Sequence, residues 1–333
     1  MRRNTSLSSA SRSNTGRQTV TVMFLCALLA IASCIAQAQG GVVTSTQNPI
    51  QLALLHWEKG NQAVHLTTGS YPIALAFDGG SLWVANAGSN TVTRMSISDG
   101  STLTTVTTSE PYGLAYDGAY LWVTNLTSQT VTKVRASDGT IQGTFAVGSD
   151  PIAAAFDGSN IWVVNLAGNT VTKLRATDGA NLGTFTVGSA PIAAAFDGTY
   201  LWVTNSGGNT VTKLSATGAI VGTYAVGSSP NGIAFDGTNI WVANQGGGNV
   251  SKLRASDGAL LGTYLVGKSP YGLAYDGQYI WVANSGNNNI TKLLASTGAS
   301  QGAIAAGTQP TAVAFDGANV WVANFSGGTV TKF

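Results

Sequence analysis

The chain is 333 residues long, and only 9% of its residues are charged, against roughly a quarter in an average globular protein. Its formal net charge is +2, but four of its basic residues and none of its acidic residues precede Ala38, so a chain processed there would carry −2. Without a basic excess or a clustered basic face, the sequence excludes nucleic acid as a partner.

Residues 1–38 predict a signal peptide. Arginines precede an apolar run at residues 20–35, and the small-residue site Ala36-Gln37-Ala38 follows it. The run is shorter than the roughly 20 apolar residues that span a bilayer, so we expect cleavage after Ala38 and no transmembrane domain in the processed chain. The segment Ile31-Ala32-Ser33-Cys34 resembles a bacterial lipobox. We therefore expect a secreted or periplasmic protein, or alternatively one that is lipid-anchored through Cys34.

Residues 39–62 form an N-terminal extension outside the repeat described below. Asn48 suits the N-cap of a helix, Pro49 its first position, and Gly60 the position past its end. The residues between them are largely apolar. The extension therefore predicts one short helix with an apolar side that must be covered.

A repeat of 39 to 40 residues occupies the rest of the chain. Each unit has one proline, followed eleven residues later by one tryptophan. Such a period is the signature of a repeat architecture, and either marker gives seven units. The prolines are Pro72, Pro111, Pro151, Pro191, Pro230, Pro270 and Pro310, and the tryptophans are Trp83, Trp122, Trp162, Trp202, Trp241, Trp281 and Trp321.

Each unit predicts four short strands separated by turns. In the unit that begins at Pro151 they cover residues 152–156, 161–165, 170–175 and 184–187. The second strand is apolar at consecutive positions, so both of its faces must be buried. No helix-length pattern with a 3.6-residue period interrupts the units. The pattern is typical of blades stacked around a channel.

The chain ends at Phe333, after the third strand of the seventh unit, and residues 63–69 precede the first proline where a fourth strand would lie. We therefore predict an all-β fold over residues 63–333: a seven-bladed β-propeller with four antiparallel strands per blade. An N-terminal outer strand would close the last blade and leave no open sheet edge there.

The segment Leu121-Trp122-Val123-Thr124-Asn125 and its six counterparts resemble the motif of the YVTN repeat propellers, with Trp in place of the family's Tyr. That resemblance implies the propeller fold and a family that includes surface-layer and exported proteins. The turn and Trp pattern is also similar to that of streptogramin B lyases, seven-bladed propellers with a histidine and acidic metal site on their loops. The corresponding loops here hold Gly, Ser and Asn.

Three sets of polar residues recur once per unit, and we interpret all three as structural. The aspartates precede a glycine in the first turn, where Asp accepts backbone hydrogen bonds. The asparagines end the second strand, where an amide can bond the loop backbone. The basic residues of the third strand are expected to approach the turn aspartates, because a buried charge needs a partner. The sets are Asp78, Asp117, Asp157, Asp197, Asp236, Asp276 and Asp316; Asn86, Asn125, Asn165, Asn205, Asn244, Asn284 and Asn324; and Arg94, Lys133, Lys173, Lys213, Lys252, Lys292 and Lys332.

Residues on either side of each proline vary between units. Strand order places the loops that connect units on the same face as the loops after the second strands, and a binding site must break the symmetry of the ring. Aromatic anchors and polar groups of this face are therefore candidates for ligand binding. They are Tyr71, Glu110, Tyr112, Asp150, Asn231, Gln245, Lys268, Tyr271 and Phe325.

The sequence favours an exported, non-catalytic binding or interaction module of the cell envelope or extracellular space, and we expect a monomer. Its partner would be a protein, a glycan or a small molecule, with no cofactor and no metal. The only histidines, His56 and His65, lie outside the repeat. Two alternatives remain open: a lyase or hydrolase of the streptogramin B lyase type, with Glu110 or Asp150 as acid or base, and a structural surface-layer component.

Overall fold

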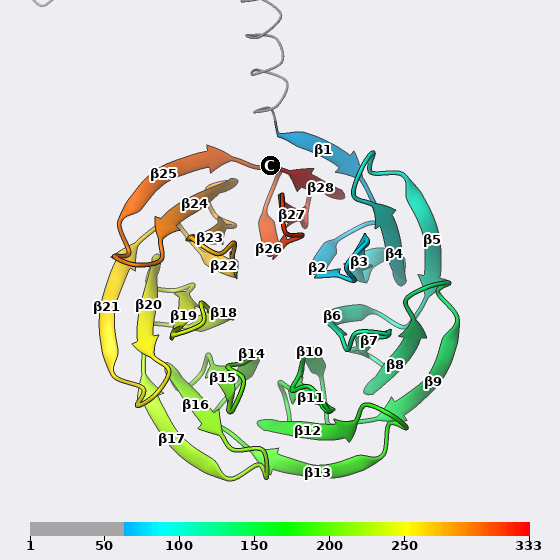
Figure 1. Cartoon of the computed structure of the whole chain (residues 1–333), viewed down its shortest axis with the longest axis horizontal. Helices are drawn as coiled ribbons and strands as arrows, with labels where there is room; N and C mark the ends of the chain where they lie inside the picture. Colours follow the sequence, from blue (N-terminus) through cyan, green and yellow to red (C-terminus); the bar gives the residue numbers. More distant parts are fainter. Residues whose placement is uncertain (1–62) are drawn as a thin grey trace, which may run out of the picture. The chain divides into compact units, whose positions relative to one another are not determined.

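The computed structural model describes residues 63–333. The predictions of a signal peptide and of a short helix in residues 39–62 lie outside these residues. The described chain forms seven four-stranded antiparallel sheets arranged in a ring (Figure 1). The predicted all-β, seven-bladed β-propeller is therefore confirmed. Within residues 63–333, no helix is long and apolar enough to span a bilayer.

The blades follow the sequence repeat. Blade 1 contains β2 (Pro72–Phe77), β3 (Ser81–Asn86), β4 (Thr91–Ser96) and β5 (Thr102–Thr107), with the 3-10 helix η1 (Ala87–Ser89). Blade 2 contains β6 (Pro111–Tyr116), β7 (Tyr120–Asn125), β8 (Thr130–Arg135) and β9 (Ile141–Ala146). Blade 3 contains β10 (Pro151–Phe156), β11 (Asn160–Asn165), β12 (Thr170–Arg175) and β13 (Asn181–Thr186). Blade 4 contains β14 (Pro191–Phe196), β15 (Leu201–Asn205), β16 (Thr210–Leu214) and β17 (Ile220–Ala225).

The remaining blades repeat this order. Blade 5 contains β18 (Pro230–Phe235), β19 (Asn239–Asn244), β20 (Asn249–Arg254) and β21 (Leu260–Leu265). Blade 6 contains β22 (Pro270–Tyr275), β23 (Tyr279–Asn284), β24 (Asn289–Leu294) and β25 (Ser300–Ala305). Blade 7 contains β26 (Pro310–Phe315), β27 (Val320–Asn324), β28 (Thr329–Lys332) and the N-terminal β1 (Val64–Thr67).

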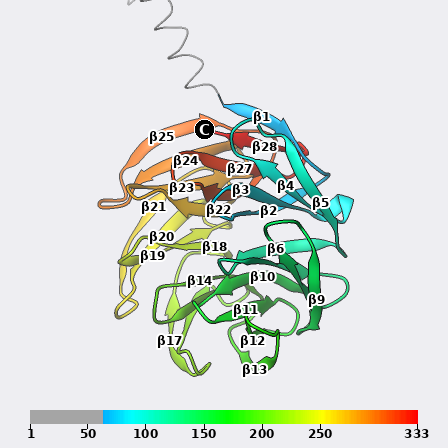
Figure 2. The same ribbon diagram turned by 45° about the vertical axis from the view of Figure 1, so that its right-hand side comes forward.

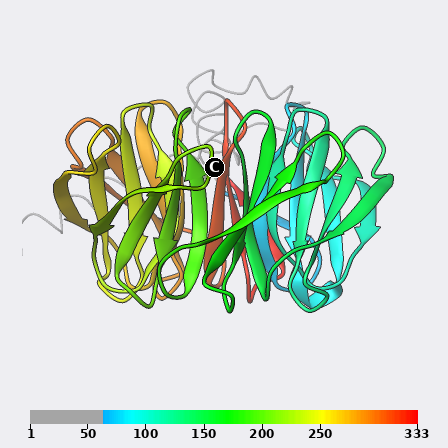
Figure 3. The same ribbon diagram turned by 90° about the horizontal axis from the view of Figure 1, so that it is seen from below.

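Within each blade, the strand that begins at the proline lies nearest the central axis and the fourth strand lies outermost (Figures 1 and 2). The strands run between two faces of the ring (Figure 3). One face carries the turns after the first strands and the turns between the third and fourth strands, and we call it the turn face. The other carries the loops that link blades and the loops between second and third strands, and we call it the loop face.

The core lies between blades. Every repeat tryptophan is 0–8% exposed, and the second strands are buried along their length. Trp162 and Val171 of blade 3 form one apolar cluster with Leu201, Val203 and Leu214 of blade 4. Neighbouring blades thus cover both faces of each second strand, as the consecutive apolar residues predicted.

The ring closes through β1, which pairs antiparallel with β28 from Val64 opposite Lys332 to Thr67 opposite Thr329. The Leu66 side chain lies against Gly100 of blade 1, where an added Cβ would come within 2.3 Å of it. The predicted closure of the last blade by an N-terminal strand is confirmed.

The outermost strands begin earlier than the sequence predicted. In blade 3 the fourth strand spans Asn181–Thr186, whereas residues 184–187 were expected. A β-bulge after Lys173 lets β13 pair with Leu174 through Asn181, and Gly183 adopts a φ of 147° there. Asn-x-Gly suggests a turn in sequence, but a bulge uses the same residues within a strand.

Candidate functional site

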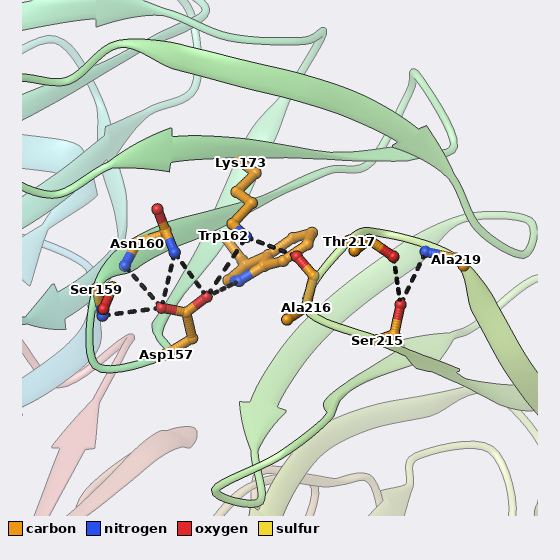
Figure 4. A network of polar contacts seen from close by, with 9 residues as sticks. All are labelled: Asp157, Ser159, Asn160, Trp162, Lys173, Ser215, Ala216, Thr217 and Ala219. Carbon is orange, nitrogen blue, oxygen red and sulfur yellow. Dashed lines mark hydrogen bonds and ion pairs between the residues drawn. The ribbon is translucent and has the colours of Figure 1, made fainter.

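The turn face is held by one hydrogen-bond network that recurs in every blade. In blade 3, Asp157 Oδ1 accepts hydrogen bonds from the backbone N–H groups of Ser159 and Asn160, at 2.9 and 2.6 Å. Asp157 Oδ2 accepts from Trp162 Nε1 at 2.8 Å (Figure 4). The same indole-to-carboxylate bond measures 2.6–2.8 Å in all seven blades. The aspartates thus hold the turns as predicted, and they also satisfy a buried indole.

The basic residues of the third strands tie neighbouring blades together. Lys173 Nζ lies 3.9 Å from Asp157 Oδ2, 4.8 Å from the centroid of the Trp162 ring, and donates to Ala216 O of blade 4 at 2.6 Å (Figure 4). Six of the seven basic residues donate to a turn carbonyl of the next blade. Burial lowers the pKa of Lys133 and Lys213, which a neighbouring aspartate partly offsets. The predicted approach of cation and turn aspartate is confirmed for Lys173 and for Arg94, which lies 3.4 Å from Asp78.

Five of the seven repeat asparagines lack the expected bond to the loop backbone. Asn165 Nδ2 donates to the hydroxyls of Thr170 and Thr172 on the next strand, at 3.1 and 2.9 Å. The expected bond to the loop backbone is formed by Asn284 Oδ1 and Asn324 Oδ1, which accept from the N–H groups of glycines in the loops that link blades. The asparagines are buried, so they mainly fasten the second strand to the third.

On the loop face, each loop that links two blades is bonded to the loop between the second and third strands. In each blade the residue before the proline accepts a backbone hydrogen bond from the first residue of that loop, at 2.8–3.0 Å. The same pre-proline residues adopt left-handed backbone, with φ between 49° and 56°. They are Tyr71, Glu110, Asp150, Ala190, Ser229, Ser269 and Gln309. This bonding places all the sequence-predicted candidates on one face, three of them at pre-proline positions.

A cavity of about 290 Å³ lies in the central channel and is lined by the first half of every innermost strand. Tyr112, Asn231 and Tyr271 line it, together with Thr311 at the same position of blade 7. The lining is otherwise apolar or backbone; it includes Ile73, Ile152, Ile192, Leu75, Leu114, Leu166 and Val313. Three of the nine sequence-predicted residues thus come together in one cavity.

The other six candidates lie around this cavity or on the rim. Gln245 supports the cavity wall, because its Oε1 accepts from Asn231 Nδ2 at 3.4 Å. The rings of Tyr71 and Phe325 stack on each other. Glu110 is bonded to the Thr127 hydroxyl through its carboxylate and to Asn90 through its N–H. Asp150 and Lys268 belong to the linking loops and are absent from the cavity lining.

Tyr112 and Tyr271 come from blades 2 and 6, whose innermost strands lie on different sides of the channel axis (Figure 1). Burial raises the pKa of Tyr112, and the adjacent Tyr271 and Glu110 raise it further. Both tyrosines line the same cavity, so their side chains approach it from different sides of the ring.

Three further residues of the cavity lining, Gly113, Gly232 and Gly272, were not predicted from the sequence. Each follows the residue after the proline in the three blades where that residue is Tyr or Asn, whereas the other four blades have alanine there. A Cβ at Gly232 would lie 2.3 Å from Tyr271 O, and one at Gly272 would lie 2.3 Å from Thr311 O. The glycines let neighbouring innermost strands approach closely. Their pairing with Tyr or Asn was visible in the sequence and could have identified the site.

A second cavity of about 530 Å³ lies on the turn face between blades 1 and 2. Its lining includes Arg94, the one arginine among the repeat cations, and Arg135. Arg94 Nη1 donates to Ser137 O at 2.8 Å, and Arg135 Nη1 pairs with Asp138 at 2.9 Å. These arginines are already engaged with protein groups, so the channel cavity is the better candidate site.

Within residues 63–333, no group of three or more His, Cys, Asp or Glu side chains is placed to hold a metal ion. No protein-family model matches the sequence. No curated protein matches it either.

Solved structures do resemble the chain. A streptogramin B lyase structure is 19% identical over 81% of this chain and 96% of its own, with a TM-score of 0.71. Hydrazine synthase of Kuenenia stuttgartiensis is 19% identical over 88% of this chain and 99% of its own, with a TM-score of 0.72. A catalytically inactive virginiamycin B lyase from Staphylococcus aureus, solved with quinupristin, is 19% identical over 81% and 98%, with a TM-score of 0.71. At this identity the likenesses show the β-propeller fold alone.

Proposed function

We propose that this chain is a non-catalytic binding module that takes its ligand at the loop-face mouth of the central channel. The proposal rests on one observation, the positions at which the seven blades differ in sequence. The turn-face network repeats in every blade, whereas the residue after the proline is Tyr112, Asn231 or Tyr271 in three blades and Ile or Thr in the others. Those three residues line the same cavity, which is the usual setting of a ligand site.

The side chains around the cavity suit recognition better than acid–base chemistry. None of the lining residues, all within the described part of the chain, carries a carboxylate, an imidazole or an amine. Glu110 and Asp150 are the acids that a lyase or hydrolase would use, and both lie outside the lining. The fold itself is compatible with either function, because propellers support both binding and catalysis.

We further propose that the protein is exported and related to the YVTN repeat propellers. Support for export comes from residues 1–38, with their arginines, apolar run and Ala36-Gln37-Ala38. Support for the relationship comes from Leu121-Trp122-Val123-Thr124-Asn125 and its counterparts. Mass spectrometry of the protein from its native envelope tests export: Gln39 or an acylated Cys34 at the N-terminus supports it, and a retained Met1 contradicts it.

A binding screen combined with metal analysis tests the function. The purified processed protein is titrated with cell-wall fragments, glycans and small metabolites, while its metal content is measured. We expect reversible binding of an unmodified ligand that weakens when Tyr112 or Asn231 is replaced. Turnover of a bound compound that stops in Glu110→Gln or Asp150→Asn would establish the enzyme alternative instead. A complete lack of binding would favour a structural surface-layer component.

A further inference from the structure

The mouth of the channel is divided into two unequal parts. Tyr112 of blade 2 and Tyr271 of blade 6 both line it, and we call them the Tyr112–Tyr271 pair; blades 7 and 1 lie on one side of the pair, and blades 3, 4 and 5 on the other. The larger side holds Ile152, Ile192 and Asn231 at the position after the proline. A ligand there would contact an isoleucine wall on one side and an amide and a phenol on the other.

Asn231 is the best-placed polar group of this part. The residue is only 7% exposed although it lines the cavity. Its backbone carbonyl accepts from the Thr204 hydroxyl at 2.8 Å, and its Nδ2 donates to Gln245 Oε1 at 3.4 Å. Its Oδ1 accepts no hydrogen bond from any residue among 63–333. An amide oxygen that lines a cavity and has no protein partner can accept a hydrogen bond from a ligand hydroxyl.

The residues that line the cavity favour a ligand without charge. The lining contains no Asp, Glu, Lys, Arg or His side chain in the described residues, and burial raises the pKa of the Tyr112 phenol. A carboxylate or ammonium group placed there would lose its water without gaining an opposite charge, which is strongly unfavourable. A neutral hydroxyl loses less and can bond Asn231 Oδ1 or a phenol.

The volume of the cavity limits the size of the ligand. The cavity of about 290 Å³ has room for about ten water molecules, at about 30 Å³ each. One six-membered ring with hydroxyl substituents fills a space of this order, whereas an extended chain would have to leave the channel.

We infer that the part of the channel mouth between the Tyr112–Tyr271 pair and Asn231 binds a single neutral, hydroxyl-bearing ring of monosaccharide size. The inference rests on the proposed function and specifies its ligand class. Both a free monosaccharide and the terminal unit of a glycan present this chemistry.

Calorimetric titration of the processed protein tests the inference with glucose, galactose, mannose and N-acetylglucosamine, and with glucuronate and glucosamine as charged analogues. We expect at least one neutral sugar to bind at least about tenfold more tightly than both charged analogues, because only the charged groups are left unpaired. Tighter binding of an oligosaccharide than of its terminal sugar would identify a glycan as the source, and equal binding would identify the free sugar.

Substitutions test whether the sugar binds in the channel. Asn231→Leu should weaken binding about tenfold, and Tyr112→Phe or Tyr271→Phe about threefold, as expected for the loss of hydrogen bonds. Tyr71→Phe is the matched control, because Tyr71 lies on the same face but outside the cavity lining, and it should leave affinity unchanged. Asn231→Ser provides a second, smaller change if Asn231→Leu fails to fold.

Three results would overturn the inference: equal or tighter binding of the charged analogues, unchanged affinity in both Asn231 variants, or weakening only in Tyr71→Phe. If no neutral sugar binds but another ligand does, and replacing Tyr112 or Asn231 weakens that binding, the inference fails while the proposed binding function stands. If nothing in either screen binds, the proposed function fails as well.

Discussion

The ring of Tyr71 stacks on the ring of Phe325, with centroids 4.8 Å apart and planes inclined by 19°. Tyr71 belongs to the loop that enters blade 1, and Phe325 to the loop after the second strand of blade 7. The pair therefore spans the seam at which the first and last blades meet, on the loop face, above the junction that β1 closes.

We predict that this stacked pair stabilises the seam. Tyr71→Ala and Phe325→Ala should each lower the free energy of unfolding, and a double-mutant cycle should give a coupling energy of about 0.5–1.5 kcal/mol, typical of aromatic pairs. Urea unfolding monitored by circular dichroism measures it. Strictly additive effects of the two substitutions would show that the rings do not stabilise each other.

Closure by β1 predicts a second effect on stability. A chain that begins at Gly69 lacks β1, whereas one that begins at Ala63 keeps it. The shorter chain should lose several kcal/mol of a typical total of about 5–15, because β28 loses its partner and becomes an exposed edge. Thermal melting and light scattering compare the two, and equal melting temperatures without aggregation would contradict closure by this strand.

The turn aspartates predict a stability that depends on pH. Burial alone would raise the pKa of Asp157, but hydrogen bonds from Trp162, Ser159 and Asn160 outweigh it, so the pKa lies below its ordinary value. The pKa values of Asp236 and Asp316 are lowered in the same way. A carboxyl with a depressed folded-state pKa stabilises the protein above its unfolded pKa of about 3.9, and this stabilisation is lost as pH falls through the folded value.

The melting temperature should therefore decrease as the pH is lowered below about 4. Asp157→Asn should lower stability at neutral pH by about 1–3 kcal/mol, because its amide cannot satisfy all the donors around it. The variant should also lose less stability than the parent between pH 5 and pH 2, as followed by calorimetry. An identical pH profile in the two proteins would show that Asp157 does not contribute to it.

Close approach of the innermost strands makes the glycines two residues after the proline sensitive to substitution. Gly232→Ala and Gly272→Ala should each destabilise the protein by about 1–3 kcal/mol, because the new Cβ would lie 2.3 Å from a backbone oxygen of the next blade. Gly80→Ala is the matched control: its Cβ would meet only Asp78 Oδ1, at 3.9 Å. Comparable losses at all three positions would show that strand packing at the channel is not the cause.

Much of this protein could be predicted from its sequence. The prolines and tryptophans recur at a nearly constant interval, and each unit repeats the same turn and strand pattern. Such features are local, so the number of blades, their strands and the closing strand follow from counting along the chain. The position of the outermost strands did not, because a bulge and a turn share the same residues around Gly183.

The candidate site depends on the tertiary structure. The register shifts just after the proline in every blade, so the pleat of the strand alone could not show which neighbours of the proline enter the channel. Tyr112 and Asn231 line the cavity, whereas Glu110 and Lys268, equally variable in sequence, lie outside its lining. Tyr112 and Tyr271 line one cavity only because closing the ring brings blades 2 and 6 to different sides of one axis. Repetition along the chain determines the blades, and ring closure determines which unrepeated side chains face one another.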